Sequence, residues 1–149
     1  MSEAPSLMPV ADARARILDA MSTVSIESVS LAQARGRVLA KDILARVTQP
    51  PVAVSAMDGY AVRARDVAAV PATLTVIGEA PAGGAFEGDI GEGQAVRIFT
   101  GGPVPTGATA IVIQEDTERN QDQVTVLEAV TEGRFIRPAG LDFSAGDVG

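Results

Sequence analysis

Glycine and proline are distributed unevenly along this chain, and their distribution constrains its fold more than any other feature. Of its 15 glycines, all but Gly36 lie beyond residue 58. The consecutive prolines Pro50 and Pro51 precede this glycine-rich part. Two prolines in succession block both a helix and a central strand. We therefore expect a domain boundary here, between residues 47 and 48.

The glycine-rich part, residues 48–137, is predicted to form a compact β domain. Short apolar segments alternate with turns that contain glycine or proline, at intervals of roughly 10–15 residues, and no long helical pattern interrupts them. This spacing is typical of a barrel-like or sandwich-like domain. The expected strands cover residues 60–63, 74–78, 95–99, 110–114, 124–127 and 135–137.

The first part of the chain, residues 1–47, is expected to combine one helix with two strands. Residues 9–22 place apolar side chains at spacings of three and four, which predicts a helix that faces a core. Alternating apolar and polar residues predict a strand over 24–28, and residues 38–43 indicate a second one. Residues 32–35 between them favour a single helical turn.

Composition removes whole classes of function. The chain contains no Cys and no His, which excludes disulfides, thiolate nucleophiles, Ser-His-Asp triads and zinc sites built from these residues. Catalysis would rest on carboxylates, hydroxyls, amides, arginine, the single Lys41 or a hard cation. The 12 basic and 19 acidic side chains give a net charge of −7, and the arginines are spread from Arg14 to Arg137. Nucleic-acid binding is therefore not expected.

The same sequence gives no reason to expect a membrane protein. No apolar run reaches the ~18 residues that a bilayer span requires. The N-terminus lacks a basic start followed by an apolar stretch, so a signal peptide is not expected either. We expect a cytoplasmic location. Because the last residues end on a glycine within a turn-rich segment, we also expect that the chain is truncated.

Two loops carry residues suited to chemistry. In the first, Asp58 precedes Gly59, a pair typical of a tight turn; alternatively, the Asp58 carboxylate serves proton transfer or binds a hard cation at the loop tip. In the second, Thr100 precedes Gly101 and Gly102. Consecutive glycines can direct N–H groups at an anion, and the threonine hydroxyl adds a donor; a rigid surface turn is the alternative.

Neither loop matches a nucleotide-binding motif. No Gly-Lys-Ser/Thr follows the second loop, and no strand–turn–helix unit surrounds the glycines of residues 88–93. Glu115 and Asp116 follow an expected strand and could approach Asp58, although charges at such positions are usually solvated.

Five segments, taken in order, resemble motifs of the molybdopterin molybdenumtransferase family, which includes the MoeA proteins and the gephyrin E domain. The two longest are VSAMDGYAVRARD and RIFTGGPVPTGATAIVIQE; the others are ARGRVLAKDI, GEAPAGGAFEGDIGEGQAVRI and IRPAGLDFSAGDVG. One departure stands beside the first motif. Where the family usually has Phe-Asp, often followed by Asn, this chain has Val52, Ala53 and Val54.

The resemblance implies a fold of the α+β class that is rich in β structure. Family proteins are much longer, so the chain would form the first two of four domains. A small helix-plus-strand domain, residues 1–47 completed by 138–149, would be interrupted by the inserted β domain of residues 48–137.

The resemblance also implies an activity. Such proteins insert molybdate into adenylylated molybdopterin with release of AMP and with Mg²⁺ involved, and they act as homodimers with a composite site. This chain alone would then be inactive; a non-catalytic β module that binds an anion or a partner is the alternative. Asp58 and Thr100 match the family's catalytic residues, and Asp58 would also bind the metal. The expected substrate-binding residues are Ser55, Gly59, Gly101 and Gly102.

Overall fold

A computed structural model of the chain describes residues 7–148, so residues 1–6 of the expected first domain and Gly149 lie outside the described residues. The chain divides into two compact units, Met1–Asp42 and Ile43–Gly149. We refer to them as the N-terminal unit and the sheet unit. Among the described residues, no helix combines the length and the apolar character that crossing a membrane demands.

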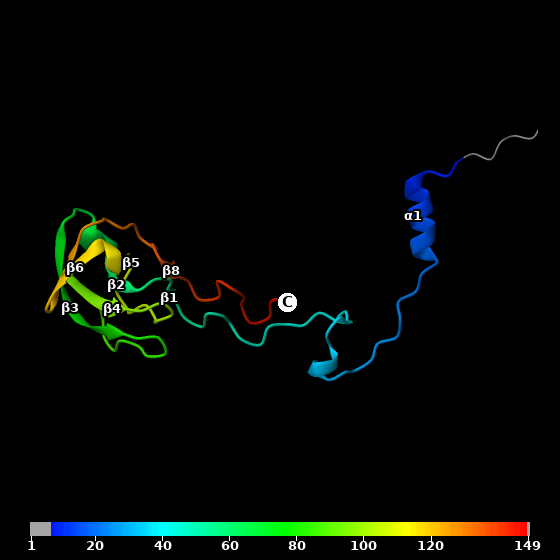
Figure 1. Cartoon of the computed structure of the whole chain (residues 1–149), viewed down its shortest axis with the longest axis horizontal. Coiled ribbons are helices and arrows are strands. Elements are labelled where there is room, and N and C mark those ends of the chain that lie inside the picture. Colours follow the sequence, from blue (N-terminus) through cyan, green and yellow to red (C-terminus); the bar gives the residue numbers. More distant parts are fainter. Residues whose placement is uncertain (1–6, 149) are drawn as a thin grey trace, which may run out of the picture. The chain divides into compact units, whose positions relative to one another are not determined.

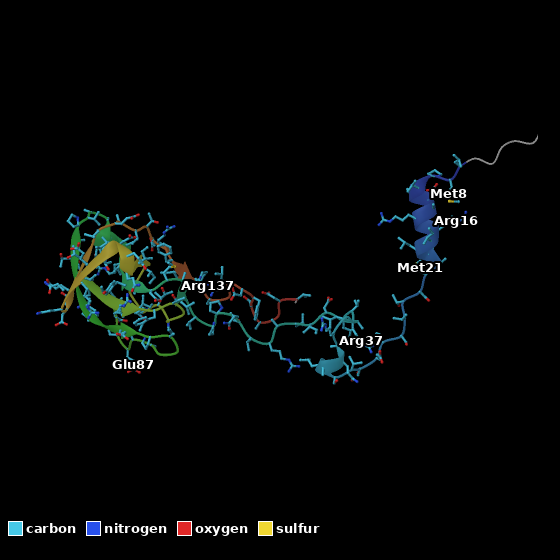
Figure 2. All side chains as sticks on the ribbon, in the orientation of Figure 1. Met8, Arg16, Met21, Arg37, Glu87 and Arg137 are labelled. Atoms are coloured by element: carbon cyan, nitrogen blue, oxygen red, sulfur yellow. The ribbon has the colours of Figure 1, made fainter. Side chains whose placement is uncertain are left out.

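The N-terminal unit contains the predicted helix, α1 (Val10–Asp19), which is shorter than the expected range. None of its residues is buried, so the prediction that this helix faces a core is wrong for this unit as described. Figure 2 labels Met8, Arg16 and Met21 along this segment, and Met8 and Met21 are both exposed. The predicted helical turn is confirmed as the short 3₁₀ helix η1 (Leu31–Gln33).

The two strands predicted in the N-terminal unit are wrong. Residues 24–28 have no regular secondary structure and no strand partner, and residues 38–43 form bends and irregular chain. A strand needs a neighbour for its backbone N–H and C=O groups, and the described part of this unit supplies none. Their apolar side chains, such as Val24 and Val38, are consequently exposed.

The sheet unit is built on a curled six-stranded sheet with strand order β5-β2-β4-β3-β7-β6 (Figure 1). All neighbours are antiparallel except β3 and β4, which run parallel. The strands are β2 (Gly59–Val62), β3 (Ala72–Ala80), β4 (Gln94–Ile98), β5 (Ala110–Ile113), β6 (Thr117–Asn120) and β7 (Gln123–Val126). Two 3₁₀ helices accompany them, η2 (Ala64–Val67) and η3 (Gln114–Asp116).

A separate two-stranded ladder joins β1 (Val54–Ser55) to β8 (Ile136–Arg137). The six strands predicted for this part of the chain are all confirmed with shifted ends, whereas β1 and β6 were not predicted. The β-rich fold class with one α-helix is likewise confirmed.

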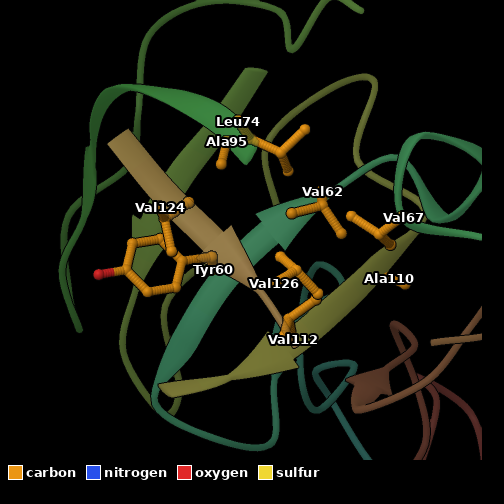
Figure 3. Packing of buried hydrophobic residues seen from close by; sticks show 9 residues of the cluster. All are labelled: Tyr60, Val62, Val67, Leu74, Ala95, Ala110, Val112, Val124 and Val126. Carbon is orange, nitrogen blue, oxygen red and sulfur yellow. The ribbon is translucent and has the colours of Figure 1, made fainter. Parts of the chain in front are cut away.

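Both faces of the curled sheet are covered by apolar side chains. Along β2, Tyr60 and Val62 belong to one buried cluster while Ala61 belongs to the other. A strand that is covered on both faces carries apolar residues at consecutive positions, as β5 does. The first cluster is shown in Figure 3 and contains Tyr60, Val62, Val67, Leu74, Ala95, Ala110, Val112, Val124 and Val126. The second contains Ala61, Ala80, Ile90, Val96, Ile98 and Ile111.

The end of the chain runs beside residues 44–50 within the sheet unit (Figure 1). The Ala45 N–H donates to the Asp147 carbonyl at 2.8 Å, and the Gln49 N–H donates to the Phe143 carbonyl at 2.9 Å. The predicted division, with residues 138–149 completing the first domain, stays a prediction.

Candidate functional site

The sheet brings the two predicted catalytic residues together. Asp58 lies in the turn that leads into β2, and Thr100 follows the end of β4. Because β2 and β4 are antiparallel neighbours with Gly59 opposite Ile98, the beginning of one strand lies at the end of the other. The two loops therefore meet at one edge of the sheet, where Asp58 and Thr100 are both exposed.

Asp58 and Thr100 form a closely bonded pair. One carboxylate oxygen of Asp58, Oδ1, accepts hydrogen bonds from the Thr100 backbone N–H at 2.7 Å and from the Thr100 hydroxyl at 2.8 Å. These two bonds lower the pKa of Asp58 below its ordinary value of 3.8; slight desolvation opposes them, and the charge of Arg97 assists. Asp58 is therefore a carboxylate at neutral pH, suited to accept a proton or hold a cation rather than to donate a proton.

Ser55 ties the two loops together from inside. Its side chain is buried, and its hydroxyl donates to the Met57 carbonyl at 2.6 Å. Its backbone makes two hydrogen bonds with the second loop, each of 2.9 Å. The Ser55 N–H donates to the Gly102 carbonyl, and the Gly101 N–H donates to the Ser55 carbonyl. These contacts give Ser55 a structural role, while its predicted part in substrate binding stays a prediction.

The glycines of the site allow close packing. A Cβ atom on Gly59 would lie 1.9 Å from the Val112 carbonyl oxygen, and one on Gly102 would lie 2.6 Å from the Ala80 carbonyl oxygen. Both positions therefore exclude a side chain.

The N–H groups of the second loop are already engaged. Gly101 donates to Ser55, and Gly102 donates to Phe99 at 2.8 Å. Together with the Thr100 N–H on Asp58, these bonds leave no converging set of amides for the anion expected at Gly101 and Gly102. Substrate binding by Gly59, Gly101 and Gly102 stays a prediction. In the structure, close backbone packing is sufficient reason for Gly59 and Gly102, and the N–H of Gly101 is engaged within the loops.

Sequence analysis missed Arg97 and Gln114. The Arg97 guanidinium donates through Nη1 to the Gly59 carbonyl at 3.1 Å and through Nη2 to Gln114 Oε1 at 2.7 Å. The Gln114 N–H in turn donates to the Asp58 carbonyl at 3.1 Å. The available signal was a charged residue between the apolar residues Val96 and Ile98 of β4. Glu115 accepts a long bond from the Gln114 amide at 3.4 Å, and among the described residues no hydrogen bond joins Glu115 or Asp116 to the Asp58 carboxylate.

The described residues supply little of a metal site. Within residues 7–148, no group of three or more His, Cys, Asp or Glu side chains is placed to hold a metal ion. Mg²⁺ commonly binds through one or two carboxylates together with water and substrate phosphates. Asp58 keeps one oxygen outside its bonds with Thr100, so it fits as a single ligand of such an ion.

Comparisons with known proteins identify the family to which this chain is similar. The family model of the MoeA N-terminal region (domain I and II) matches residues 8–149. Molybdopterin molybdenumtransferase 2 of Mycobacterium tuberculosis (strain CDC 1551 / Oshkosh) is 45% identical over 123 residues, which cover 80% of this chain and 30% of that protein. Molybdopterin molybdenumtransferase of Haemophilus influenzae is 35% identical over 144 residues, which cover 95% of this chain and 35% of that protein.

A solved structure agrees with the sequence relatives. The crystal structure of the molybdopterin biosynthesis moeA protein from Pyrococcus horikoshii OT3 matches with a TM-score of 0.79 and 38% identity, over 96% of this chain and 39% of that chain. This chain thus spans about a third of the length of the curated relatives it matches. With the family model and these relatives matching most of its residues, the chain belongs to the MoeA N-terminal region family.

Proposed function

We propose that this chain acts in molybdenum cofactor biosynthesis, as the N-terminal part of an enzyme that inserts molybdate into adenylylated molybdopterin and releases AMP. The observation that carries this proposal is the Asp58–Thr100 pair. Two separate family motifs each supply one residue, and the fold joins them by two hydrogen bonds at an exposed edge. The similar curated proteins are named molybdopterin molybdenumtransferase, which supports a transferase activity.

The geometry suggests what each residue does in this reaction. Thr100 fixes one oxygen of Asp58, so the second oxygen has a defined direction at the edge. An ionised, oriented carboxylate can position an attacking water or a cation beside a phosphoanhydride. Mg²⁺, when bound, would neutralise charge on the phosphates of the substrate. Asp58 is the one predicted metal ligand in this part of the enzyme.

The rest of the site must come from elsewhere. The substrate is multiply anionic, whereas this chain carries a net charge of −7 and the loop amides beside Asp58 are engaged internally. We infer that a second copy of the protein supplies the main substrate-binding surface in a homodimer, through residues beyond this chain. The proposed location is the cytoplasm.

A chimera tests the proposal directly. This chain would replace the corresponding N-terminal region of the Haemophilus influenzae relative, and AMP release from adenylylated molybdopterin would be measured with molybdate present. We expect AMP release by the chimera, and a loss of about 100-fold in kcat for Asp58→Asn. The matched control is Asp116→Asn, an acid of η3 whose side chain takes no part in the hydrogen bonds of the Asp58–Thr100 pair. A folded chimera without activity would contradict the proposal.

The isolated chain provides the second arm of this test. It should release no AMP, because the composite site lacks its substrate-binding part. AMP release by the isolated chain would refute the composite site. The alternative, a module that binds an anion without catalysis, is less well supported because its loop amides already have acceptors. Calorimetric titration of the chain with molybdate should accordingly give no heat of binding.

A further inference from the structure

Arg97 lies near the end of the inner strand β4, three residues before Thr100. In the β2–β4 ladder it lies opposite Tyr60, so the two side chains share one face of the sheet. It is the one charged residue within β4. A guanidinium group within a strand loses part of its hydration, which is unfavourable. The contacts of Arg97 should therefore compensate for this loss.

The guanidinium group of Arg97 bridges two elements. Nη1 donates to the Gly59 carbonyl at the start of β2, and Nη2 donates to the side-chain oxygen of Gln114 in η3. The planar guanidinium presents these donors in a fixed fork, which the single ammonium group of lysine cannot reproduce. Arg97 thereby joins three elements that surround the Asp58 turn.

Two aromatic rings hold the guanidinium group in this orientation. The Arg97 Cζ atom lies 4.8 Å from the centre of the Phe99 ring and 5.2 Å from the centre of the Tyr60 ring, distances at which cation–π attraction is effective. Tyr60 belongs to the buried cluster, at whose side Figure 3 shows its ring. The arginine is therefore anchored against the rigid part of the sheet.

Three of the four contacts of Arg97 described above lead to a neighbour of the Asp58–Thr100 pair. Gly59 directly follows Asp58, Phe99 directly precedes Thr100, and the Gln114 N–H bonds to the Asp58 carbonyl. Arg97 makes no hydrogen bond to the Asp58 carboxylate, which accepts its bonds from Thr100. Apart from its charge, which helps to lower the pKa of Asp58, Arg97 therefore acts on the pair through the chain segments that carry Asp58 and Thr100.

We propose that Arg97, anchored through Gln114, is a positioning residue that holds the Asp58 and Thr100 loops in register for the transferase reaction. This inference rests on the proposed function for its kinetic test. A positioning error of about 1 Å can cost roughly 100-fold in rate, whereas substrate binding by groups elsewhere is spared. Loss of Arg97 should therefore lower kcat far more than it changes KM.

Kinetic measurements on the chimera test the inference. Arg97→Gln removes both the charge and the fork and should lower kcat about 100-fold, while KM changes less than about threefold. Arg97→Lys keeps the charge without the fork and should lose about tenfold in kcat. The matched control is Arg119→Gln on β6, whose guanidinium bonds to Gln121 and which should behave as the unsubstituted chimera. Values of kcat within about twofold for both Arg97 variants would overturn the inference.

Amide hydrogen exchange in the isolated chain separates positioning from general stability. In Arg97→Gln, the Thr100 N–H should exchange about tenfold faster while the amide of Val124, on β7 and separated from β4 by β3, stays unchanged. Equal acceleration at both amides would show a merely structural role and overturn the inference. Should the unsubstituted chimera release no AMP, the proposed function fails, and this exchange measurement still decides whether Arg97 positions the pair.

Discussion

The two units of this chain contain similar kinds of side chains, yet one buries them and the other does not. In the sheet unit, Ile98 is completely buried between neighbouring strands. In the N-terminal unit, Leu31 is 96% exposed and Val24 is 90% exposed. The difference lies in the partners available to each segment. The inner strands of the sheet unit, such as β2 and β4, have neighbouring strands on both sides and covering side chains on both faces.

This contrast shows that apolar content alone does not create a core. α1 has ten residues and no buried side chain, and an isolated helix of this length is marginal in water. An ion pair between Arg37 and Glu27 does not replace packing, because exposed pairs contribute little. Substitutions of one kind should therefore have different consequences in the two units.

The largest difference is expected for deletion of apolar side-chain volume. Ile98→Ala leaves a cavity within the second buried cluster and should lower the free energy of unfolding by about 3 to 4 kcal/mol. Ile17→Ala in α1, where the side chain is 57% exposed, should change it by less than about 0.5 kcal/mol. Urea unfolding followed by fluorescence of Tyr60, the single tyrosine, measures both. Similar losses in the two variants would contradict the contrast.

A second difference is expected at glycine. In Gly59→Ala the new Cβ would overlap the Val112 carbonyl oxygen, so neighbouring strands must separate, at a cost of about 2 to 3 kcal/mol. Gly36→Ala meets nothing within 4 Å and strains only its own backbone, with a φ of +79°, at a cost of about 1 kcal/mol. The same unfolding measurement applies. A Gly59→Ala protein as stable as the Gly36→Ala protein would show that the strands yield without cost.

Amide exchange provides a third comparison that needs no substitution. The amides of α1 should exchange within about tenfold of the rate of an unstructured chain, because no buried contacts hold the helix. Amides of the central strands β2 and β4 should be protected close to the level set by global unfolding. Strong protection of α1 that grows with protein concentration would instead reveal that a second copy covers it.

The success of the strand predictions follows the same contrast. Strands such as β5 and β7 carry apolar residues bounded by turns, and the local pattern is sufficient to identify them. β6 was missed because its sequence, TERN, is polar along its whole length, and only pairing with β7 makes it a strand. Residues 24–28 show the reverse case, since their alternation is favourable while no neighbouring strand is present.

For the candidate site, the motifs identified Asp58 and Thr100 but not their connection. The local sequence does not indicate that two residues 42 positions apart form two hydrogen bonds. The β2–β4 register brings them together. The predicted roles of Gly101 and Gly102 in substrate binding stay predictions; what the local sequence did not indicate is that loop closure engages their N–H groups with acceptors of the chain itself. Arg97 was missed for a related reason, as its partners are set by the pairing of strands.

The smallest expected effect concerns the Asp58–Thr100 pair, where the folded sheet gives an exposed side chain a defined environment. Thr100→Ala removes the hydroxyl bond and keeps the stronger backbone bond, so the pKa of Asp58 should rise only part of the way toward 3.8. Because the folded pKa lies below the unfolded one, the pair stabilises the protein fully above about pH 4, and this contribution is lost as the pH falls through the lowered pKa. The stabilities of the two proteins should therefore converge in acid and differ slightly at neutral pH.

Carboxyl NMR titration measures the pKa of Asp58, with Thr106→Ala, a substitution at an exposed threonine of the same loop, as the control. An unchanged pKa in Thr100→Ala would mean that the hydroxyl bond does not order the carboxylate, and that exposed side chains of the sheet unit are as unconstrained as those of the N-terminal unit.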